Sequence, residues 1–135
     1  MNNLGIAVKS FIINNKEELL LIKRRNNDIH KPGIWEIPGG RLKLGENPFE
    51  GLKRETREET GLDIDILNPL GVHYFTRDDK QKITMIIFYC KPLSNLVKLS
   101  EEHTEYLWNN LHESFSRLDS TFHEEIRNYK KYFSR

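Results

Sequence analysis

Short runs of β-branched and aliphatic residues, separated by polar turns, dominate the pattern of hydrophobic and polar positions. Runs of this kind predict β-strands. The first two runs are separated only by Asn14-Asn15-Lys16, which predicts a hairpin at the start of the chain. The predicted strands cover residues 6–14, 18–22, 34–37, 62–66, 72–75 and 82–91, with a shorter one at 106–108.

One helix is predicted with clear signals at both ends, over residues 48–60. Asn47 suits the N-cap and Pro48 the first helical position. Glu50 stands three residues after the cap, as a capping-box partner would. Gly61 fits the position just past the C-terminal end. We therefore expect these boundaries to lie within a few residues of the real ones.

A second helix is predicted at the end of the chain, over residues 121–133. Apolar or aromatic residues recur there every three or four positions, as in an amphipathic helix: Phe122, Ile126, Tyr129 and Phe133. Strands, a central helix, further strands and a final helix predict an α+β domain with a mixed β-sheet between helices (α/β/α). Residues 1–135 have the length of one domain, and no repeat or linker divides them.

Charge and cysteine content narrow the function classes. Lysine plus arginine (21) nearly balances aspartate plus glutamate (20), so no overall basic field attracts nucleic acid or an anionic membrane. Met1 to Lys9 lacks the basic n-region and long apolar h-region expected of a signal peptide, and no run approaches the ~20 apolar residues of a membrane span. The single cysteine, Cys90, follows an apolar run and predicts a buried, inert thiol. We expect a cytoplasmic protein.

The central helix is unusually rich in charge. Plotted at 100° per residue, Glu55 and Glu59 lie together and Glu58 lies one step further round, while Arg54 falls on the other flank. The arc expected to face the sheet holds Phe49, Leu52, Thr56 and Thr60. A plain alternative is a solvated face with i,i+4 ion pairs, each worth only ~0.2–0.5 kcal/mol.

The segment before this helix favours a chemical role for its carboxylates. Pro38-Gly39-Gly40 is a break that regular elements do not tolerate in their interior. The two glycines let the backbone approach a ligand closely, and Glu46 lies in the loop that leads to the helix. Mg²⁺ takes oxygen ligands and keeps several waters for exchange with phosphate oxygens. The pattern therefore predicts a hard-cation site.

From Gly40 to Leu62 the chain reads Gly40, five residues, Glu46, seven residues, then Arg54-Glu55-Thr56-Arg57-Glu58-Glu59-Thr60-Gly61-Leu62. This pattern resembles the Nudix box. It departs from the family at Thr56, where a bulky aliphatic residue is usual. Trp35-Glu36-Ile37-Pro38-Gly39-Gly40 resembles the family's approach to the box, and Glu102-His103 followed by Trp108 resembles a later segment. The resemblance implies the Nudix fold over essentially the whole chain.

The resemblance also implies a reaction, in which water attacks one phosphorus of a diphosphate and the box glutamates bind divalent cations. Glu55 and Glu59 are the expected main ligands, since i,i+4 spacing lets both reach one ion. Glu58 is a further ligand or a water-orienting base, and the Gly39 carbonyl is an additional ligand. We expect Mg²⁺, which Mn²⁺ can replace.

Other residues have supporting roles under this interpretation. Arg54 is expected to orient carboxylates, and Glu46 to bond to the helix start or to Arg54. Glu102 is the first choice for the general base among the carboxylates of its loop, with a solvated acidic loop as the alternative. The histidines show no metal spacing, and Lys23-Arg24-Arg25 is expected to be a solvated strand end.

Substrate contacts are expected at Trp35, Gly39 and Gly40, although a tryptophan before a Pro-Gly-Gly turn is also a common packing residue. Pocket residues are expected in segments 25–35, 74–82 and 94–108. The first expectation is a pyrophosphohydrolase that converts a nucleoside triphosphate to the monophosphate and pyrophosphate, acting as a monomer or homodimer on a small nucleotide. ADP-ribose, another nucleotide sugar or a dinucleoside polyphosphate is the alternative substrate, and a non-catalytic nucleotide-binding module is the alternative class.

Overall fold

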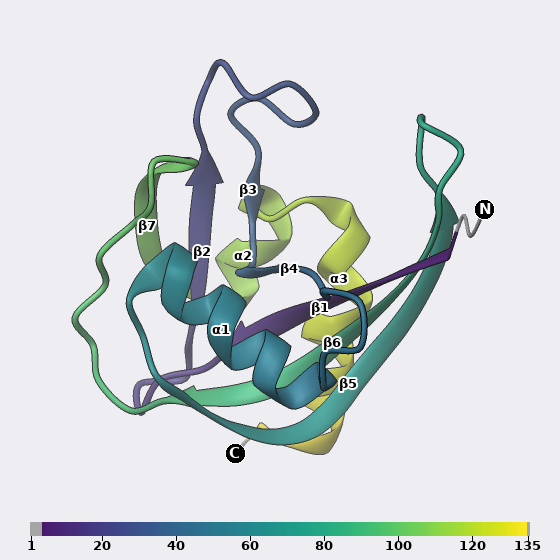
Figure 1. The fold of residues 1–135 in the computed structure, drawn as a ribbon. Coiled ribbons are helices and arrows are strands. Elements are labelled where there is room, and N and C mark those ends of the chain that lie inside the picture. Colours follow the sequence, from purple (N-terminus) through teal and green to yellow (C-terminus); the bar gives the residue numbers. More distant parts are fainter. Residues whose placement is uncertain (1–3, 135) are drawn as a thin grey trace.

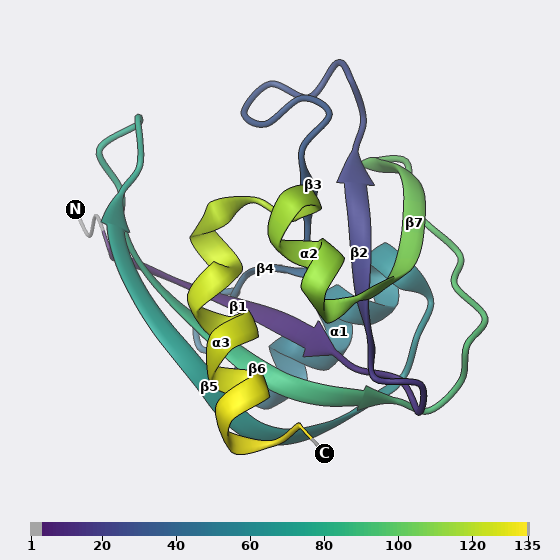
Figure 2. The ribbon, with the colours of Figure 1, turned by 180° about the vertical axis from the view of Figure 1, so that it is seen from behind.

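The computed structural model describes residues 4–134, whose three α-helices lie on either side of two β-sheets (Figures 1 and 2). In chain order the elements are β1 (Leu4–Ile12), β2 (Glu18–Arg24), β3 (Trp35–Glu36), β4 (Gly39–Arg41), α1 (Pro48–Thr60), β5 (Ile64–Thr76), β6 (Lys82–Pro92), β7 (His103–Asn110), α2 (Leu111–Arg117), a 3₁₀ turn (Ser120–Phe122) and α3 (His123–Tyr132).

The predicted α+β class and the mixed sheet between helices are confirmed. One sheet has the order β4-β1-β6-β5, in which β1 is parallel to β6 and the other pairs are antiparallel. The second sheet, β3-β2-β7, is antiparallel. Helix α1 buries Leu52 with Val8 and Ile12. On the other side α3 buries Ile126 and Tyr129 in a separate hydrophobic cluster, so the strands lie between helices.

The predicted hairpin at the start of the chain is wrong. A turn does form, in which Asn14 Oδ1 accepts hydrogen bonds from the amides of Lys16 and Glu18 at 3.0 and 2.9 Å. However, β1 and β2 belong to different sheets and are joined only by an isolated bridge between Ile13 and Leu19. Both edges of β1 are already occupied, by β4 on one side and by β6 on the other, so β2 pairs elsewhere.

The two strands predicted at 62–66 and 72–75 are one long strand, β5. Its pairing with β6 shifts register between Ile66 and Asn68 and again between Pro69 and Gly71. Bulges of this kind absorb residues that do not fit a regular ladder. Since β5 is an edge strand, the missing amide of Pro69 is also tolerated.

Two further predictions about local structure were incomplete. Gly39 and Gly40, expected to interrupt regular structure, lie in the short strand β4 and pair with β1. The strand predicted at 106–108 extends over the whole of β7, and the short helix α2 that follows it was not predicted. The predicted terminal helix is confirmed as α3 and its preceding 3₁₀ turn, with Phe122 buried.

Helix α1 has the predicted bounds. Asn47 Oδ1 accepts hydrogen bonds from the amides of Phe49 and Glu50, and Gly61 ends the helix with φ 73°. Leu52, Thr56 and Thr60 are fully buried, as expected. Phe49 is 49% exposed, and its ring lies 5.5 Å from the ring of Phe88 in a tilted arrangement.

Thr56 has a specific partner that accounts for a hydroxyl at this buried position. Its Oγ1 lies 3.0 Å from Oγ of Ser10, which is also fully buried on β1. One hydroxyl donates a hydrogen bond to the other, so both buried hydroxyl groups have a partner. The predicted buried, free thiol of Cys90 is confirmed. None of the helices among residues 4–134 is long and apolar enough to cross a membrane.

Candidate functional site

Glu55 and Glu59 of α1 meet the backbone of β4. Oε1 of Glu59 accepts a hydrogen bond of 2.8 Å from the amide of Gly39. A Cβ atom on Gly40 would lie 2.6 Å from Oε2 of Glu55, so the missing side chain of Gly40 provides the space for that carboxylate. The expected i,i+4 pair therefore does converge on the glycine segment.

Replacing Gly40 with alanine should displace the Glu55 carboxylate while leaving the fold stable, since the clash involves only the end of a flexible side chain. We expect substrate turnover to fall about 10- to 100-fold, because moving a group at the reacting centre by about an ångström can slow a reaction by that factor. The free energy of unfolding should change by less than ~1 kcal/mol. Turnover and urea unfolding measured on the same preparation test this expectation; unchanged turnover would contradict it.

Arg54 joins the carboxylates of this region. It donates to Glu46 from Nε at 2.7 Å and to Glu55 from Nη1 at 3.1 Å, and the same Nη1 reaches both oxygens of Glu58 at 3.2 Å. Although Arg54 falls on the other flank of the helix wheel, its long side chain reaches these carboxylates, in agreement with the expectation that it orients them. Its expected bond to Glu46 is present, and this bond is the main cause that lowers the pKa of Glu46 to about 2.

Burial disfavours the ionised forms of Glu55 and Glu59, and their neighbours offset this effect only in part. Desolvation raises the pKa of Glu59 to about 7, although Lys9 and the amide of Gly39 oppose the shift. Desolvation also raises the pKa of Glu55, against the opposing charge of Arg54. The side chain of Glu58 is 57% exposed. A cation placed beside Glu55 and Glu59 would therefore be favourable, because it would offset the desolvation of their ionised forms.

A buried charge cluster, formed by Lys9, Arg24, Glu36 and His103, lies on the strands beside this site. Glu36 accepts from Lys9 Nζ at 3.2 Å and contacts His103 Nε2 at 2.9 Å. Arg24 Nε lies 3.4 Å from Glu36 Oε2. Burial alone would raise the pKa of Glu36, but Lys9, His103 and Arg24 outweigh it and hold the pKa at about 2.

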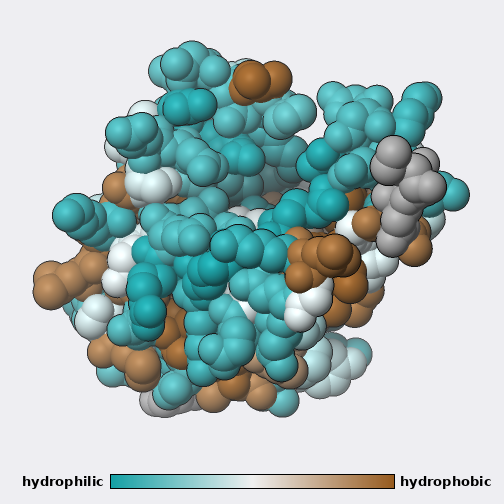
Figure 3. Space-filling view, viewed as in Figure 1, coloured by the Kyte–Doolittle hydropathy of each residue, from teal (hydrophilic) through white to brown (hydrophobic). Residues whose placement is uncertain are grey.

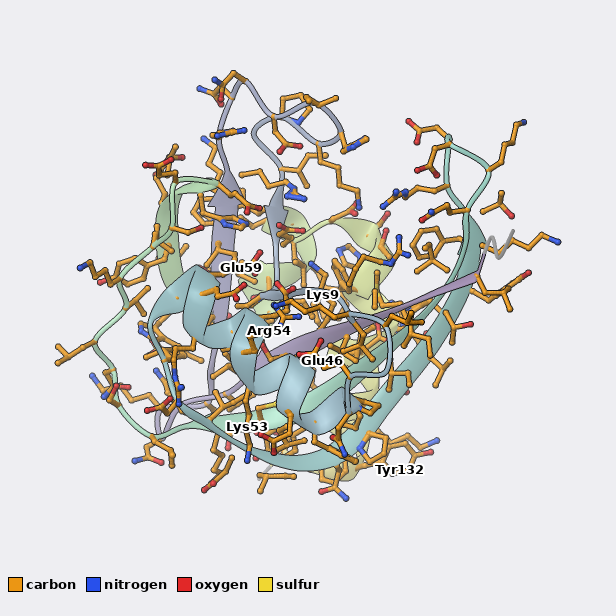
Figure 4. All side chains as sticks on the ribbon, in the orientation of Figure 1. Lys9, Glu46, Lys53, Arg54, Glu59 and Tyr132 are labelled. Atoms are coloured by element: carbon orange, nitrogen blue, oxygen red, sulfur yellow. The ribbon has the colours of Figure 1, made fainter. Side chains whose placement is uncertain are left out.

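Sequence reasoning missed this cluster, since its members come from four strands. The expected solvated strand end at Lys23-Arg24-Arg25 is wrong for Arg24, whose side chain is only 20% exposed and contacts Glu36. Glu36 and His103 do lie in the two further segments that resemble the Nudix family, Trp35 to Gly40 and Glu102-His103. This resemblance was the signal in the sequence that could have indicated them. Figure 4 shows Lys9 of β1 near the C-terminal half of α1 that carries Glu59.

A cavity of about 330 Å³ opens next to Gly40, between the β2–β3 loop and the β5–β6 hairpin. The surface is indented between these two segments, and its rim is hydrophilic (Figure 3). Its apolar lining comes from Ala7, Phe75, Ile83 and Met85, and its charged or ionisable lining from Lys9, Arg24, His30, Lys31, Glu36, Arg41, Arg77 and Asp78. Two of the expected pocket segments, 25–35 and 74–82, contribute residues to the lining of this cavity.

The third expected pocket segment, 94–108, borders a different hollow. That hollow has a volume of about 570 Å³ and is lined by Ser94, Asn95, Tyr106 and Trp108, but by none of the predicted site residues. Proximity to Gly40 and to the buried charge cluster therefore favours the smaller cavity as the substrate site.

Trp35 and Glu102 lie at the periphery. Trp35 packs against the hydrophobic cluster beneath α3, and its ring lies 5.7 Å from the guanidinium carbon of Arg117. These contacts agree with the alternative expectation that Trp35 is a packing residue. The side chain of Glu102 is exposed, while its carbonyl accepts from the amide of Arg25. Nearby, the amide of Ser100 donates to the carbonyl of Glu59, which ties the loop of Glu102 to the end of α1.

The donor set beside β4 fits a hard divalent cation. Its atoms are carboxylate oxygens, and the carboxylate of Glu55 occupies the space that the missing side chain of Gly40 leaves. Within residues 4–134 no three histidine, cysteine, aspartate or glutamate side chains converge as a complete metal cage. Mg²⁺ does not require one, since it commonly takes one or two carboxylates and fills its remaining positions with water and substrate phosphate.

Comparison with known proteins agrees with this geometry. The NUDIX domain model matches residues 3–133. The crystal structure of a MutT protein from Methanosarcina mazei superposes with a TM-score of 0.85 and 30% identity, covering 99% of this chain and 98% of that one.

Two curated relatives have names that state an activity. The nucleoside triphosphatase NudI of Escherichia coli is 34% identical over 108 residues, which cover 72% of this chain and 76% of NudI. The ADP-ribose pyrophosphatase of Methanocaldococcus jannaschii is 34% identical over 95 residues, which cover 70% of this chain and 55% of the relative. The matched regions span between 33% and 62% of the length of five curated relatives, so several of these are much longer than the region they share.

Proposed function

Since this chain belongs to the Nudix family, we propose that it is a metal-dependent hydrolase of diphosphate bonds that converts a nucleoside triphosphate to the monophosphate and pyrophosphate. The observation that carries the proposal is the cavity beside Gly40. Its lining combines cationic and apolar side chains, and Gly40, which also lines it, lies against the Glu55 carboxylate of α1. A nucleotide has matching parts, because its phosphates are anionic and its base is flat and largely apolar on both faces.

The charge around the cavity favours a triphosphate. Five lining side chains are cationic, namely Lys9, Arg24, Lys31, Arg41 and Arg77, and two are carboxylates, Glu36 and Asp78. Cationic side chains therefore outnumber carboxylates in the lining, even though Lys9 and Arg24 both contact Glu36. A triphosphate carries more negative charge than the diphosphate of a nucleotide sugar, so it gains more from this rim.

Glu55 and Glu59 are proposed to hold Mg²⁺, or Mn²⁺ in its place, with Glu58 as a further ligand or water-orienting base and the Gly39 carbonyl as an additional ligand. When bound, the metal neutralises phosphate charge and lowers the pKa of water. Arg54 holds the side chains of Glu55 and Glu58 in place through its hydrogen bonds.

Three residues complete the proposed site. Glu46 accepts two hydrogen bonds from the Nε and Nη2 edge of the Arg54 guanidinium. Glu102 is proposed as the general base, since its loop is tied to Glu59 through Ser100. Trp35 is proposed to support the mouth of the site by packing. The proposed setting is cytoplasmic, with a small nucleotide as the partner.

An alternative substrate is a nucleotide sugar such as ADP-ribose, which the name of the Methanocaldococcus relative favours. Release of phosphate and pyrophosphate from a panel of nucleoside triphosphates, nucleotide sugars and dinucleoside polyphosphates separates these candidates. Each compound should be assayed with Mg²⁺, with Mn²⁺ and with chelator. We expect metal-dependent turnover concentrated on triphosphates. Turnover concentrated on ADP-ribose would select the alternative, and nucleotide binding without any turnover would favour a non-catalytic module.

A further inference from the structure

Lys9 is an unusual buried cation. It lies on β1, and only 8% of its surface is exposed. Its ammonium group donates to Glu36 Oε1 at 3.2 Å and to the carbonyl of Ile37 at 3.1 Å. An ammonium group has three donors. Among residues 4–134, these two oxygens are the acceptors that Lys9 has, and the ring of Phe122 lies 6.0 Å away. One donor is therefore available to a ligand.

Stability gives little reason to place a lysine here. Removing an ammonium group from water costs several kcal/mol, and a buried ion pair often does no more than recover that cost. Glu36 also has two other cationic or hydrogen-bonding partners, Arg24 and His103. An apolar side chain at position 9 would avoid the desolvation cost. The lysine thus provides something that the pairing of Glu36 does not require.

The position of Lys9 suggests that its role is to contact a ligand. Lys9 lines the cavity beside Gly40, together with Glu36 and Arg41. A Cβ on Gly39 would lie 2.9 Å from Cδ of Lys9, so the lysine stem crosses this glycine, whose amide holds Glu59. Lys9 also opposes the raised pKa of Glu59 by its charge. The ammonium group therefore lies between the cavity and the carboxylates of α1.

We infer that Lys9 is a phosphate-binding residue, whose third N–H donates to a non-bridging oxygen of the diphosphate group in the cavity. The inference rests on the proposed function, since it names a contact to the substrate of that reaction. Burial strengthens the contact, because a charge-assisted hydrogen bond is stronger where water is excluded. The bonds to Glu36 and Ile37 hold the ammonium group in place before the phosphate arrives.

A purely structural role for Lys9 predicts something different. If Lys9 served only to pair with Glu36, removal of either side chain would disturb the same strands. Both removals would then weaken the binding of pyrophosphate to the same extent. They would also misplace Gly39 and Glu59, and so would weaken binding of Mg²⁺ alone. If Lys9 binds phosphate, its removal weakens phosphate binding selectively, and Mg²⁺ affinity stays equal or rises because a nearby positive charge is gone.

Calorimetric titration with two probes distinguishes these roles. Inorganic pyrophosphate is titrated in the presence of Mg²⁺, and Mg²⁺ is titrated alone. The variants are Lys9→Met, Lys9→Gln, Glu36→Gln and Lys53→Met. Lys53 is exposed and points away from Lys9 in Figure 4, so its substitution controls for the loss of one positive charge. Lys9→Gln provides a second neutral variant in case the methionine variant does not fold, and melting temperatures verify folding.

Both Lys9 variants should lose about 10- to 100-fold in pyrophosphate affinity, the range for a hydrogen bond to a charged group. Their Mg²⁺ affinity should not fall, and Lys53→Met should bind pyrophosphate within about threefold of the unmodified protein. Glu36→Gln keeps an oxygen that can accept from Lys9 Nζ, so it should lose less pyrophosphate affinity than either Lys9 variant. Equal losses in the Lys9 and Glu36 variants, a parallel loss of Mg²⁺ affinity, or no pyrophosphate binding by the unmodified protein would each overturn the inference. Failure of the proposed function would instead appear as absent triphosphate turnover despite Lys9-dependent pyrophosphate binding.

Discussion

Glu59→Gln is expected to lower turnover of the substrate by about 10²- to 10³-fold, the loss that corresponds to several kcal/mol of metal-dependent stabilisation. Glutamine keeps an oxygen that can accept the hydrogen bond from the Gly39 amide, but it has no charge with which to bind a cation. Because burial penalises the ionised carboxylate, the neutral side chain should leave the protein at least as stable as before. The same loss of turnover is expected for Glu55→Gln.

Steady-state kinetics at saturating Mg²⁺ and thermal unfolding without metal measure the two parts of this prediction. Glu50→Gln is the matched control, since Glu50 is an exposed carboxylate on the first turn of the same helix. The control should retain normal turnover. Near-normal turnover in both Glu55→Gln and Glu59→Gln would rule out these residues as the metal ligands.

Gly39→Ala is expected to destabilise the fold by about 3 kcal/mol or more, the sum of backbone strain and overpacking. Gly39 has φ 145°, which side chains rarely adopt. A Cβ there would collide with the carbonyl oxygen of Val8 and lie 2.7 Å from Cα of Lys9. These are backbone atoms of β1, which is held between β4 and β6 and cannot move aside easily.

Gly45→Ala separates strain from collision. Gly45 also has a positive φ, of 75°, but a Cβ there would meet no atom within 4 Å. It should cost about 1–2 kcal/mol, the strain of a left-handed residue alone. Urea unfolding of both variants tests the comparison. Equal losses of unfolding free energy would show that the contact with β1 contributes nothing.

Helix α1 could be predicted from the sequence because its signals are local. Asn47, Pro48 and Gly61 act within one turn of the helix ends, and the structure contains the expected cap. The convergence of Glu55 and Glu59 follows from the same periodicity. The contact of Arg54 with Glu55 was not predicted, because a wheel projection locates Cβ atoms, whereas the guanidinium lies several bonds further and reaches both Glu55 and Glu58.

The strand pairing could not be predicted in the same way, because it depends on distant segments. The parallel partner of β1 is β6, so Leu4 pairs with Lys82 and Ile12 with Cys90. No local pattern near Asn14 distinguishes this arrangement from a hairpin. The buried charge cluster also joins distant segments, since His103 contacts Glu36 within the sheet β3-β2-β7 and Lys9 reaches it from β1 of the other sheet.

The most direct test of the account is identification of the products formed from a nucleoside triphosphate with Mg²⁺, using ³¹P NMR. We expect monophosphate and pyrophosphate in equal amounts, no reaction in chelator, and a reaction that is about 10²- to 10³-fold slower in Glu59→Gln. Formation of nucleoside diphosphate and orthophosphate, or turnover that persists in chelator, would contradict it.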